Sequence, residues 1–228
     1  MCPPAASPHS DDQPINDASD SQPVPTCIPH DALSQAAYRH AASLLHPLIL
    51  AHSTRVFLFA RQLSQQESST WHEEPRLPLL VVACIFHDIG TTDRYNTGPT
   101  RFEIEGADAA VKFLQQYGVS DQDKRDVWMA IALHDTPQIA ERILGLVRLV
   151  RVAVMADFKR ASALAIFDPS IVAAIEEEFA RGEIEKVLGD TVVGQALKSP
   201  EKAPPACWPG GEAFIDSKQI STCTQTLT

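Results

Sequence analysis

Between residues 31 and 198 the chain carries helix start and stop signals at close intervals. Pro47 and Pro78 stand where the first turn of a helix tolerates proline, because the missing N–H group would have no partner there. Asp168 followed by Pro169 is typical of an N-cap and the first helical position, and Gly182 breaks the helix that they begin. We predict an all-α fold, a single helical bundle, with helices at 32–45, 47–65, 78–88, 103–117, 120–135, 139–157, 168–180 and 183–198.

The segment from residue 139 to residue 157 is strongly apolar, and by composition alone it suits a strand as well as a helix. Its length exceeds that of an ordinary strand, and Arg148 and Arg151 are three residues apart, which places both on one face of a helix. We therefore expect a buried helix over 139–157.

The two ends of the chain differ in composition from its middle. Residues 1–30 contain seven prolines and four aspartates but no lysine or arginine, so they bury too little apolar surface to offset the entropy of ordering. We predict a disordered tail over 1–30 and a helical domain over 31–198. Prolines and glycines recur from residue 199 onward. We expect 199–228 to be a C-terminal extension or flap, in which Phe214 and Ile215 pack on the domain.

The charge balance and the cysteines exclude several classes of protein. Lysine and arginine total 19 against 29 aspartate and glutamate residues, a formal net charge of −10, so neither nucleic acid nor an anionic membrane is expected as a partner. The longest apolar run, Leu77 to Phe86, is about half as long as a membrane span. Five cysteines without a CxxC pair predict no disulfide framework and a reducing, cytoplasmic setting. We expect a small-molecule substrate. The sequence is compatible with a homo-oligomer.

Three of the eight histidines lie in apolar helical contexts: His52, His87 and His134. His87 is followed by Asp88, and a second His-Asp pair occurs at His134 and Asp135. Asp157 ends the most apolar predicted helix, where an unpaired carboxylate would be costly and a metal ion would neutralise it. Zn²⁺ and Fe²⁺ accept imidazole nitrogen together with carboxylate oxygen. Two histidines and two aspartates from three helices can therefore supply the four ligands of a metal site.

Three segments carry these residues: AHSTRVFLFA with His52, VVACIFHDIGTT with His87 and Asp88, and VRVAVMADF with Asp157. Their order and spacing resemble the HD-domain metalloenzyme superfamily. The run FHDIGTT, followed by RFEIEGADAA and then AIALHD, is similar to the cyanamide hydratase-like branch of that superfamily. The resemblance covers about residues 35–160.

The resemblance implies a fold, a ligand set and catalytic roles. Residues 31–198 would be an HD-type helical metal-binding domain. The metal ligands would be His52, His87, Asp88 and Asp157. Asp88 would act in catalysis as a ligand that also carries a proton. His134 and Glu103 would act from the substrate pocket. Two hydroxyl groups would contact the ligands or the substrate: Thr91 and Thr92.

The resemblance also implies a metal. The cofactor would be one divalent ion, Zn²⁺ in the first place with Fe²⁺ or Mn²⁺ as alternatives, because imidazole and carboxylate ligands suit all three. His134 is the only histidine between the two aspartate ligands, whereas binuclear members of the superfamily use additional histidines in that interval. A carboxylate from Glu103 or Glu105 could still help to hold a second ion. The pair of His134 and Asp135 is the alternative to the first His-Asp pair as the metal-binding pair.

The branch implies a metal-dependent hydratase, a hydro-lyase that adds water to a small nitrile-like substrate such as cyanamide, giving urea. The alternative is an HD-type phosphohydrolase acting on a nucleoside monophosphate or a similar ester, with Arg94, Arg101 and Lys112 as candidate partners of the phosphoryl oxygens. HD nucleotidases commonly place a glutamate shortly after the His-Asp pair, and residues 89–92 contain none, which favours the hydratase. A non-catalytic helical binding module is a third class, and the intact ligand set argues against it.

Overall fold

The chain folds into helices joined by short loops. The computed structural model describes residues 23–205 and 207–208, and within these ranges it contains no strand. The helices are α1 (Ala32–Ala42), α2 (Pro47–Gln66), α3 (Leu77–Phe86), α4 (Phe102–Gln115), α5 (Asp121–Leu133), α6 (Leu146–Asp157), α7 (Ala161–Leu164), α8 (Pro169–Glu178) and α9 (Ile184–Lys198). Short 3₁₀ helices lie between or after them: η1 (Thr70–His72), η2 (Ile89–Thr91), η3 (Ala140–Arg142) and η4 (Pro200–Lys202). The predicted all-α helical bundle is confirmed.

The helix boundaries follow from capping groups close to the predicted positions. The side chains of Asp31, Ser120 and Asp168 accept hydrogen bonds from backbone N–H groups in the first turns of α1, α5 and α8. Pro47 is the first residue of α2, as the sequence predicts. Gly182 has a positive φ of 53° and separates α8 from α9. Local sequence therefore determines where these helices begin and end.

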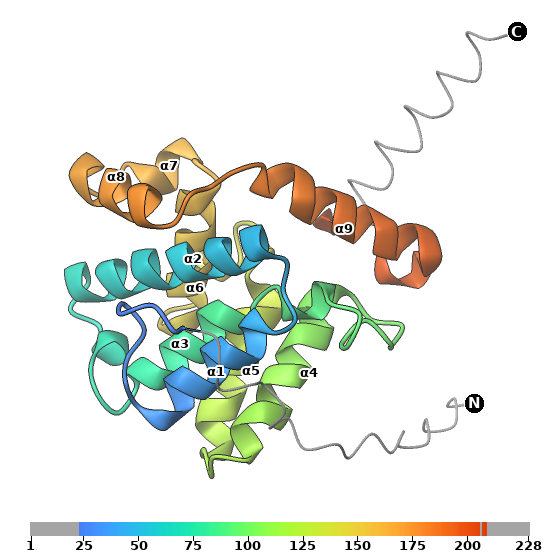
Figure 1. The fold of residues 1–228 in the computed structure, drawn as a ribbon, viewed down its shortest axis with the longest axis horizontal. Coiled ribbons are helices and arrows are strands. Elements are labelled where there is room, and N and C mark those ends of the chain that lie inside the picture. The colour runs from blue at the N-terminus through green and yellow to red at the C-terminus, as the bar shows by residue number, and fades with distance from the viewer. Residues whose placement is uncertain (1–22, 206, 209–228) are drawn as a thin grey trace, which may run out of the picture.

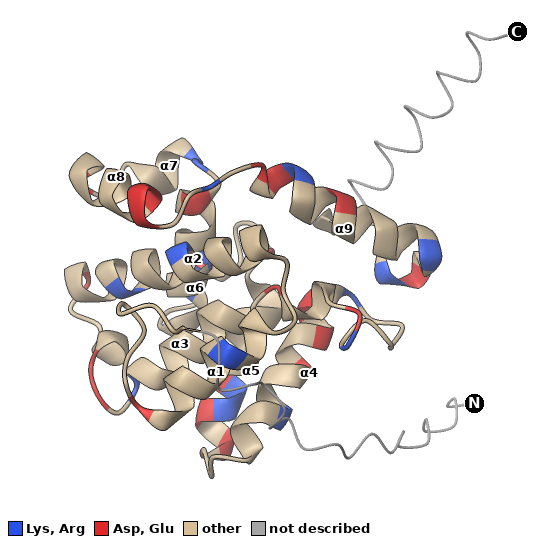
Figure 2. Ribbon diagram, viewed as in Figure 1, with Lys and Arg blue, Asp and Glu red and all other residues tan. Residues whose placement is uncertain are grey.

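Helix α3 forms the centre of the bundle. All of its residues are buried, and Figure 2 shows no charged residue on it. It packs against α1, α2, α4, α5 and α6 (Figure 1). This burial on every side accounts for its continuous apolar sequence. Among the described residues, no helix combines the length and the apolar character needed to cross a membrane.

Helix α9 and the segment that follows it lie along one side of the bundle (Figure 1). α9 packs against α2 and against the η2 turn that follows α3. The Gln195 side chain donates a hydrogen bond to the Gly90 carbonyl at 3.1 Å, and the Lys202 ammonium donates one to the Thr100 carbonyl at 2.9 Å. Both donors are buried, so the C-terminal part of the described chain is tied to the loop between α3 and α4.

Two boundaries differ from the predicted ones by more than three residues. The helix expected over 139–157 begins only at Leu146, because η3 and Gly145, with a φ of 77°, precede it. The predicted disordered tail extends too far, since Ile28 has no exposed surface and packs in the core. Ile28, together with Val24 and Cys27, which pack against the core beside it, attaches residues 23–30 to the bundle. Residues 1–22 lie outside the described residues, as do Phe214 and Ile215 of the expected flap.

Candidate metal centre

Three side chains from two adjacent helices meet in the interior. His52 lies in α2, and His87 and Asp88 follow one another where α3 ends. The Nε2 atoms of His52 and His87 are 3.1 Å apart. Asp88 Oδ2 lies 3.1 Å from His87 Nε2 and 3.5 Å from His52 Nε2. All three side chains are buried, and their ligand atoms lie within 4.8 Å of one another. Two ligands bound about 2.1 Å from one ion can lie up to about 4.2 Å apart, so one ion can reach all three atoms.

Hydrogen bonds behind the two imidazoles leave their inner nitrogens available to a cation. His87 Nδ1 donates to the Cys84 carbonyl at 2.6 Å, and His52 Nδ1 donates to Asp157 Oδ2 at 2.6 Å. Because the proton of each ring is then on Nδ1, the two Nε2 lone pairs face each other across 3.1 Å. Facing lone pairs repel unless a proton or a metal ion lies between them, so this arrangement suits a metal ion.

The Asp88 carboxylate supports the same interpretation. It is 1% exposed, and among the described residues neither of its oxygens has a hydrogen-bond partner. Burial alone would raise its pKa, but the neighbouring rings of His87, His52 and His134 outweigh burial and hold the pKa below its usual range. A buried carboxylate without hydrogen bonds, next to imidazole nitrogens, is a donor set for a divalent cation. The residues present therefore fit the metal that the sequence predicts.

The turn after the His-Asp pair contacts helix α4 backbone to backbone. A Cβ atom added to Gly90 would overlap the Phe102 carbonyl oxygen and would lie 2.8 Å from the Gly106 nitrogen. A Cβ atom added to Gly106 would meet the Phe86 carbonyl oxygen at 3.2 Å. Glycine at the end of a helix is usually a left-handed cap, but the φ of Gly90 is not positive. The reason for glycine here is the close approach, which brings α4 to the metal-binding turn.

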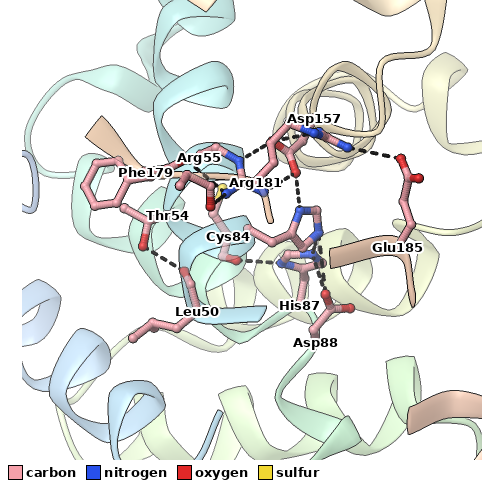
Figure 3. A network of polar contacts seen from close by, with 12 residues as sticks. Leu50, Thr54, Arg55, Cys84, His87, Asp88, Asp157, Phe179, Arg181 and Glu185 are labelled. Carbon is pink, nitrogen blue, oxygen red and sulfur yellow. Dashed lines mark hydrogen bonds and ion pairs between the residues drawn. The ribbon is translucent and has the colours of Figure 1, made fainter. Parts of the chain in front are cut away.

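Asp157, the fourth predicted ligand, is held by a polar network that includes Arg55 and Arg181 (Figure 3). Its Oδ2 accepts the hydrogen bond from His52, and Arg55 donates to both of its oxygens at 2.6 and 2.9 Å. Arg55 is fully buried and also donates to the carbonyls of Phe179 and Ala180, where α8 leads into α9. Burial raises the pKa of Asp157, but its two partners outweigh burial and hold the pKa below its usual range. Asp157 thus orients His52 from outside the group of three atoms, and a ligand role for it stays a prediction.

His134, at the end of α5, lies next to the other oxygen of Asp88, with Nε2 3.7 Å from Oδ1. Its Nδ1 donates to the Ile131 carbonyl at 2.6 Å, so its Nε2 carries a lone pair. Burial and the His87 ring lower its pKa to about 3, which keeps the ring neutral near pH 7. Within the described residues, His134 and Asp135 do not belong to the group that can hold an ion, so the first His-Asp pair is favoured as the metal-binding pair.

A cavity of about 600 Å³ opens beside these residues. Its polar lining includes His52, His87, Asp88, His134, Asp135 and Arg151. Its apolar lining includes Phe102, Met155, Phe158, Leu188 and Trp208. Burial and the nearby Glu103 carboxylate raise the pKa of Asp135 to about 7, so this carboxyl exists in both protonation states near neutral pH.

The two predicted substrate-binding threonines are not part of this lining. Thr91 and Thr92 donate their hydroxyl protons to the carbonyls of Asp88 and Ile89, at 2.6 and 2.7 Å. These hydrogen bonds close the turn after the His-Asp pair. The bond from Thr91 is a contact with the predicted ligand residue Asp88, and a contact of either hydroxyl group with a substrate stays a prediction.

The two predicted glutamates also lie away from the cavity lining. Glu103 is 1% exposed, neither of its oxygens has a hydrogen-bond partner, and burial raises its pKa. The nearest cation to it is Arg101, at 3.7 Å. Glu105 accepts hydrogen bonds from Thr100 and Lys202 at 2.9 and 3.4 Å and is engaged there rather than beside the metal-binding residues. A catalytic role for Glu103 stays a prediction.

None of the three cations predicted to hold a phosphate lines the cavity: Arg94, Arg101 and Lys112. Arg151 and Arg160 line it instead, and the guanidinium of Arg151 is occupied by the protein itself. Its Nε donates to Glu141 Oε1 at 2.9 Å, and its Nη1 donates to the His134 carbonyl at 3.0 Å and lies 3.8 Å from Asp135. The predicted cationic clamp is therefore absent among the described residues.

Three residues of the site have no role in the sequence-based prediction: Arg55, Arg151 and Phe158. Arg55 carries a recognisable signal, because it follows His52 by three residues inside the apolar run of α2 and so lies on the same helix face. Arg151 is a cation in the strongly apolar segment that forms α6, which also indicates a buried partner. Phe158 packs on His52 with 4.8 Å between ring centroids, and nothing in the sequence distinguishes it from a core residue.

Comparison with known families agrees with this geometry. Residues 49–204 match the family model described as HD domain. The match spans more than half of the chain and includes His52, His87, Asp88, His134 and Asp157. No curated protein sequence matches the chain.

Proposed function

The chain belongs to the HD domain family of metal-dependent enzymes, and we propose that it is a hydratase that adds water to the C≡N group of a neutral substrate. Cyanamide, which gives urea, is the simplest such substrate. One divalent ion held by His52, His87 and Asp88 would supply water that ionises near neutral pH. Zn²⁺ suits this donor set, and Fe²⁺ and Mn²⁺ are alternatives.

The charge of the cavity carries the proposal. Asp88 and Asp135 line it, and Glu103 lies close enough to raise the pKa of Asp135. Arg151, the cation beside them, is engaged by Glu141 and by a backbone carbonyl. A phosphate ester would bring negative charge against those of these carboxylates that are ionised, whereas a neutral nitrile-like group meets no such repulsion. Arg160, the other lining arginine, is exposed, so the lining as a whole favours a neutral substrate.

His134 has the position and the protonation state of a proton carrier. The ring lines the cavity, its lowered pKa keeps it neutral, and its Nε2 lies 3.7 Å from Asp88 Oδ1. As water adds, an O–C bond forms, one C–N π bond breaks, and the proton released by water passes to His134 Nε2 and then to the substrate nitrogen. The adduct tautomerises to the carbonyl form, so nothing is oxidised or reduced.

The proposal is tested with the full-length protein, loaded in turn with Zn²⁺, Fe²⁺ and Mn²⁺. Cyanamide and simple nitriles should give urea or amides, measured by chromatography, while nucleoside monophosphates should release no phosphate. His134→Ala should lower kcat by roughly 10²–10⁴, the usual effect of losing a positioned acid–base group. His72→Ala removes a histidine that contacts Ser64 outside the cavity and should leave kcat close to that of the wild type. Phosphate release without hydration would reject the proposal.

Arg160 favours a second candidate, a phosphohydrolase acting on a nucleoside monophosphate or a similar ester. It lines the cavity, it is exposed, and it forms no ion pair with the described residues. A phosphohydrolase should lose about 10²-fold in kcat/KM on Arg160→Ala, the scale found when a charge-stabilising donor is removed. A hydratase with a neutral substrate should lose little. Arg125→Ala, which removes an exposed arginine outside the cavity, is the matched control.

A further inference from the structure

The cavity is much larger than the simplest substrate of the proposed reaction. It encloses about 600 Å³, within the range of roughly 300–1,000 Å³ typical of sites for drug-sized ligands. Cyanamide has only three non-hydrogen atoms, so at the ~30 Å³ that one water molecule occupies in the liquid it would fill on the order of 100 Å³. The remaining space would hold water against apolar side chains, which is unfavourable.

Aromatic rings lead from the metal-binding residues into this remaining space. Phe158 packs on His52, and Phe102 packs edge-on against His134 with 5.8 Å between ring centroids. Trp208 continues the row, packing against Phe102 at 6.1 Å. All three aromatic side chains line the cavity. Such rings contact a flat apolar group through offset or edge-on packing, which a small polar molecule cannot use.

Helix α9 forms another side of the cavity, and one of its lining residues is a glycine with open space beside it. Leu188 and Gly189 both line the cavity, and a Cβ atom added to Gly189 would meet no atom within 4 Å. Glycine inside a helix lowers its stability relative to other residues. At residue 189 the missing side chain leaves open space at the wall of the cavity that the aromatic rings also line. Gly194, on the same helix, also has no atom within 4 Å of an added Cβ but does not line the cavity.

We propose that this remaining space binds an aromatic or other ring-sized apolar group of the substrate, and that Gly189 keeps it open. The inference rests on the proposed hydration reaction and names its substrate class: a nitrile or cyanamide that carries an apolar substituent, such as an aryl cyanamide. The C≡N group lies at the metal-binding residues, and the substituent extends along Phe102 toward Trp208 and α9. Hydration of an aryl cyanamide consumes one water and gives the aryl urea, by the same bond changes as for cyanamide.

The experiment compares cyanamide with phenylcyanamide, using the full-length protein loaded with Zn²⁺. Burial of a phenyl ring should raise kcat/KM for phenylcyanamide at least about tenfold above that for cyanamide. Gly189→Leu fills the space and should lower kcat/KM for phenylcyanamide by about tenfold or more, a usual effect of a misfit in an apolar pocket. The same variant should lower kcat/KM for cyanamide by a much smaller factor, because cyanamide has no substituent to place in that space. Gly194→Leu makes the same exchange outside the cavity and should leave both substrates unaffected.

Binding of the products gives a readout that does not depend on turnover. Isothermal titration should show that phenylurea binds the wild type at least about tenfold more tightly than urea does, since its ring is buried. Gly189→Leu should abolish this difference and Gly194→Leu should retain it. Leucine is a better helix former than glycine, so both variants are expected to fold, and circular dichroism checks this.

The outcomes separate this inference from the proposed function. Tighter binding of phenylurea that depends on residue 189, without turnover of either substrate, would overturn the hydratase and support the apolar site. Turnover of cyanamide without any gain from the phenyl group, or with equal loss of both substrates in Gly189→Leu, would support the hydratase and overturn the apolar site. If neither substrate reacts and phenylurea binds no more tightly than urea, both are wrong.

Discussion

Replacing Arg55 by alanine tests how the metal-binding residues are supported from behind. The guanidinium is fully buried, donates to both oxygens of Asp157, and reaches two backbone carbonyls between α8 and α9. Its removal leaves the Asp157 carboxylate with His52 Nδ1 and, 3.6 Å away, Arg181. The variant therefore leaves a buried carboxylate with too few partners and a metal-binding imidazole that is less firmly oriented.

The expected cost follows from the burial of this pair. Removing one partner of a buried ion pair costs about 3–5 kcal/mol of unfolding free energy. For a chain of this size each kcal/mol shifts Tm by about 2–4 °C, so Tm should fall by roughly 6–20 °C. Loss of a group that orients a ligand histidine typically weakens metal binding by about 10–100-fold. Because the folded-state pKa of Asp157 is lowered, this stabilisation is present above the unfolded value of 3.8 and is lost as the pH falls through the folded value.

The assay has two parts, urea denaturation of the metal-free protein and Zn²⁺ affinity by competition with a chelator. Arg148→Ala is the matched control, because Arg148 pairs with Glu67 where both side chains are partly exposed, and its loss should cost about 1 kcal/mol or less. The double variant Arg55→Met with Asp157→Leu should recover stability but not Zn²⁺ affinity, since it removes the unpaired charge. A stability of Arg55→Ala equal to that of Arg148→Ala, together with unchanged Zn²⁺ affinity, would refute the reasoning.

Three further predictions concern other parts of the site and the core. His87→Ala should abolish both bound metal and activity, and elemental analysis showing full metal content would mean that His87 is not a ligand. Ile28→Ala should lower the free energy of unfolding by about 2–5 kcal/mol, because Ile28 is fully buried, and a negligible change in urea denaturation would place it outside the core. Asp135→Asn should stabilise the metal-free protein at pH 8, because the pKa of Asp135 is raised from 3.8 to about 7 and the folded state therefore resists its ionisation. This gain should shrink toward zero near pH 4, and a gain that is independent of pH in urea denaturation would contradict the assignment.

Much of this architecture was accessible from local sequence. Helix starts and stops depend on a few neighbouring residues, so Pro47, Ser120 and the Asp168-Pro169 pair mark their helices correctly. His87 and Asp88 are adjacent in the chain and follow the most apolar helix, so their meeting in the interior required no knowledge of distant contacts. The predicted helix start at residue 139 is wrong, because a strongly apolar composition does not show that Gly145 adopts a positive φ.

Other features depended on contacts between residues far apart in the chain. His52 and Asp157 are adjacent in space because α2 packs on α6, and that packing also brings Arg55 onto both oxygens of the aspartate. No local pattern distinguishes a metal ligand from a carboxylate that supports one. Gly90 likewise has its explanation in helix α4, whose backbone passes where a side chain would be.

The sequence by itself determined the helices and the residues that can bind a metal, because both depend on short-range order along the chain. The size and charge of the cavity came from the tertiary structure, because helices α2, α4, α6 and α9 each contribute part of its lining. Their packing excludes Arg94 and Arg101 from that lining, occupies Arg151 with protein acceptors, and leaves open space beside Gly189. A cavity is the volume that side chains from distant segments fail to fill, and that volume is a property of their packing rather than of any one segment.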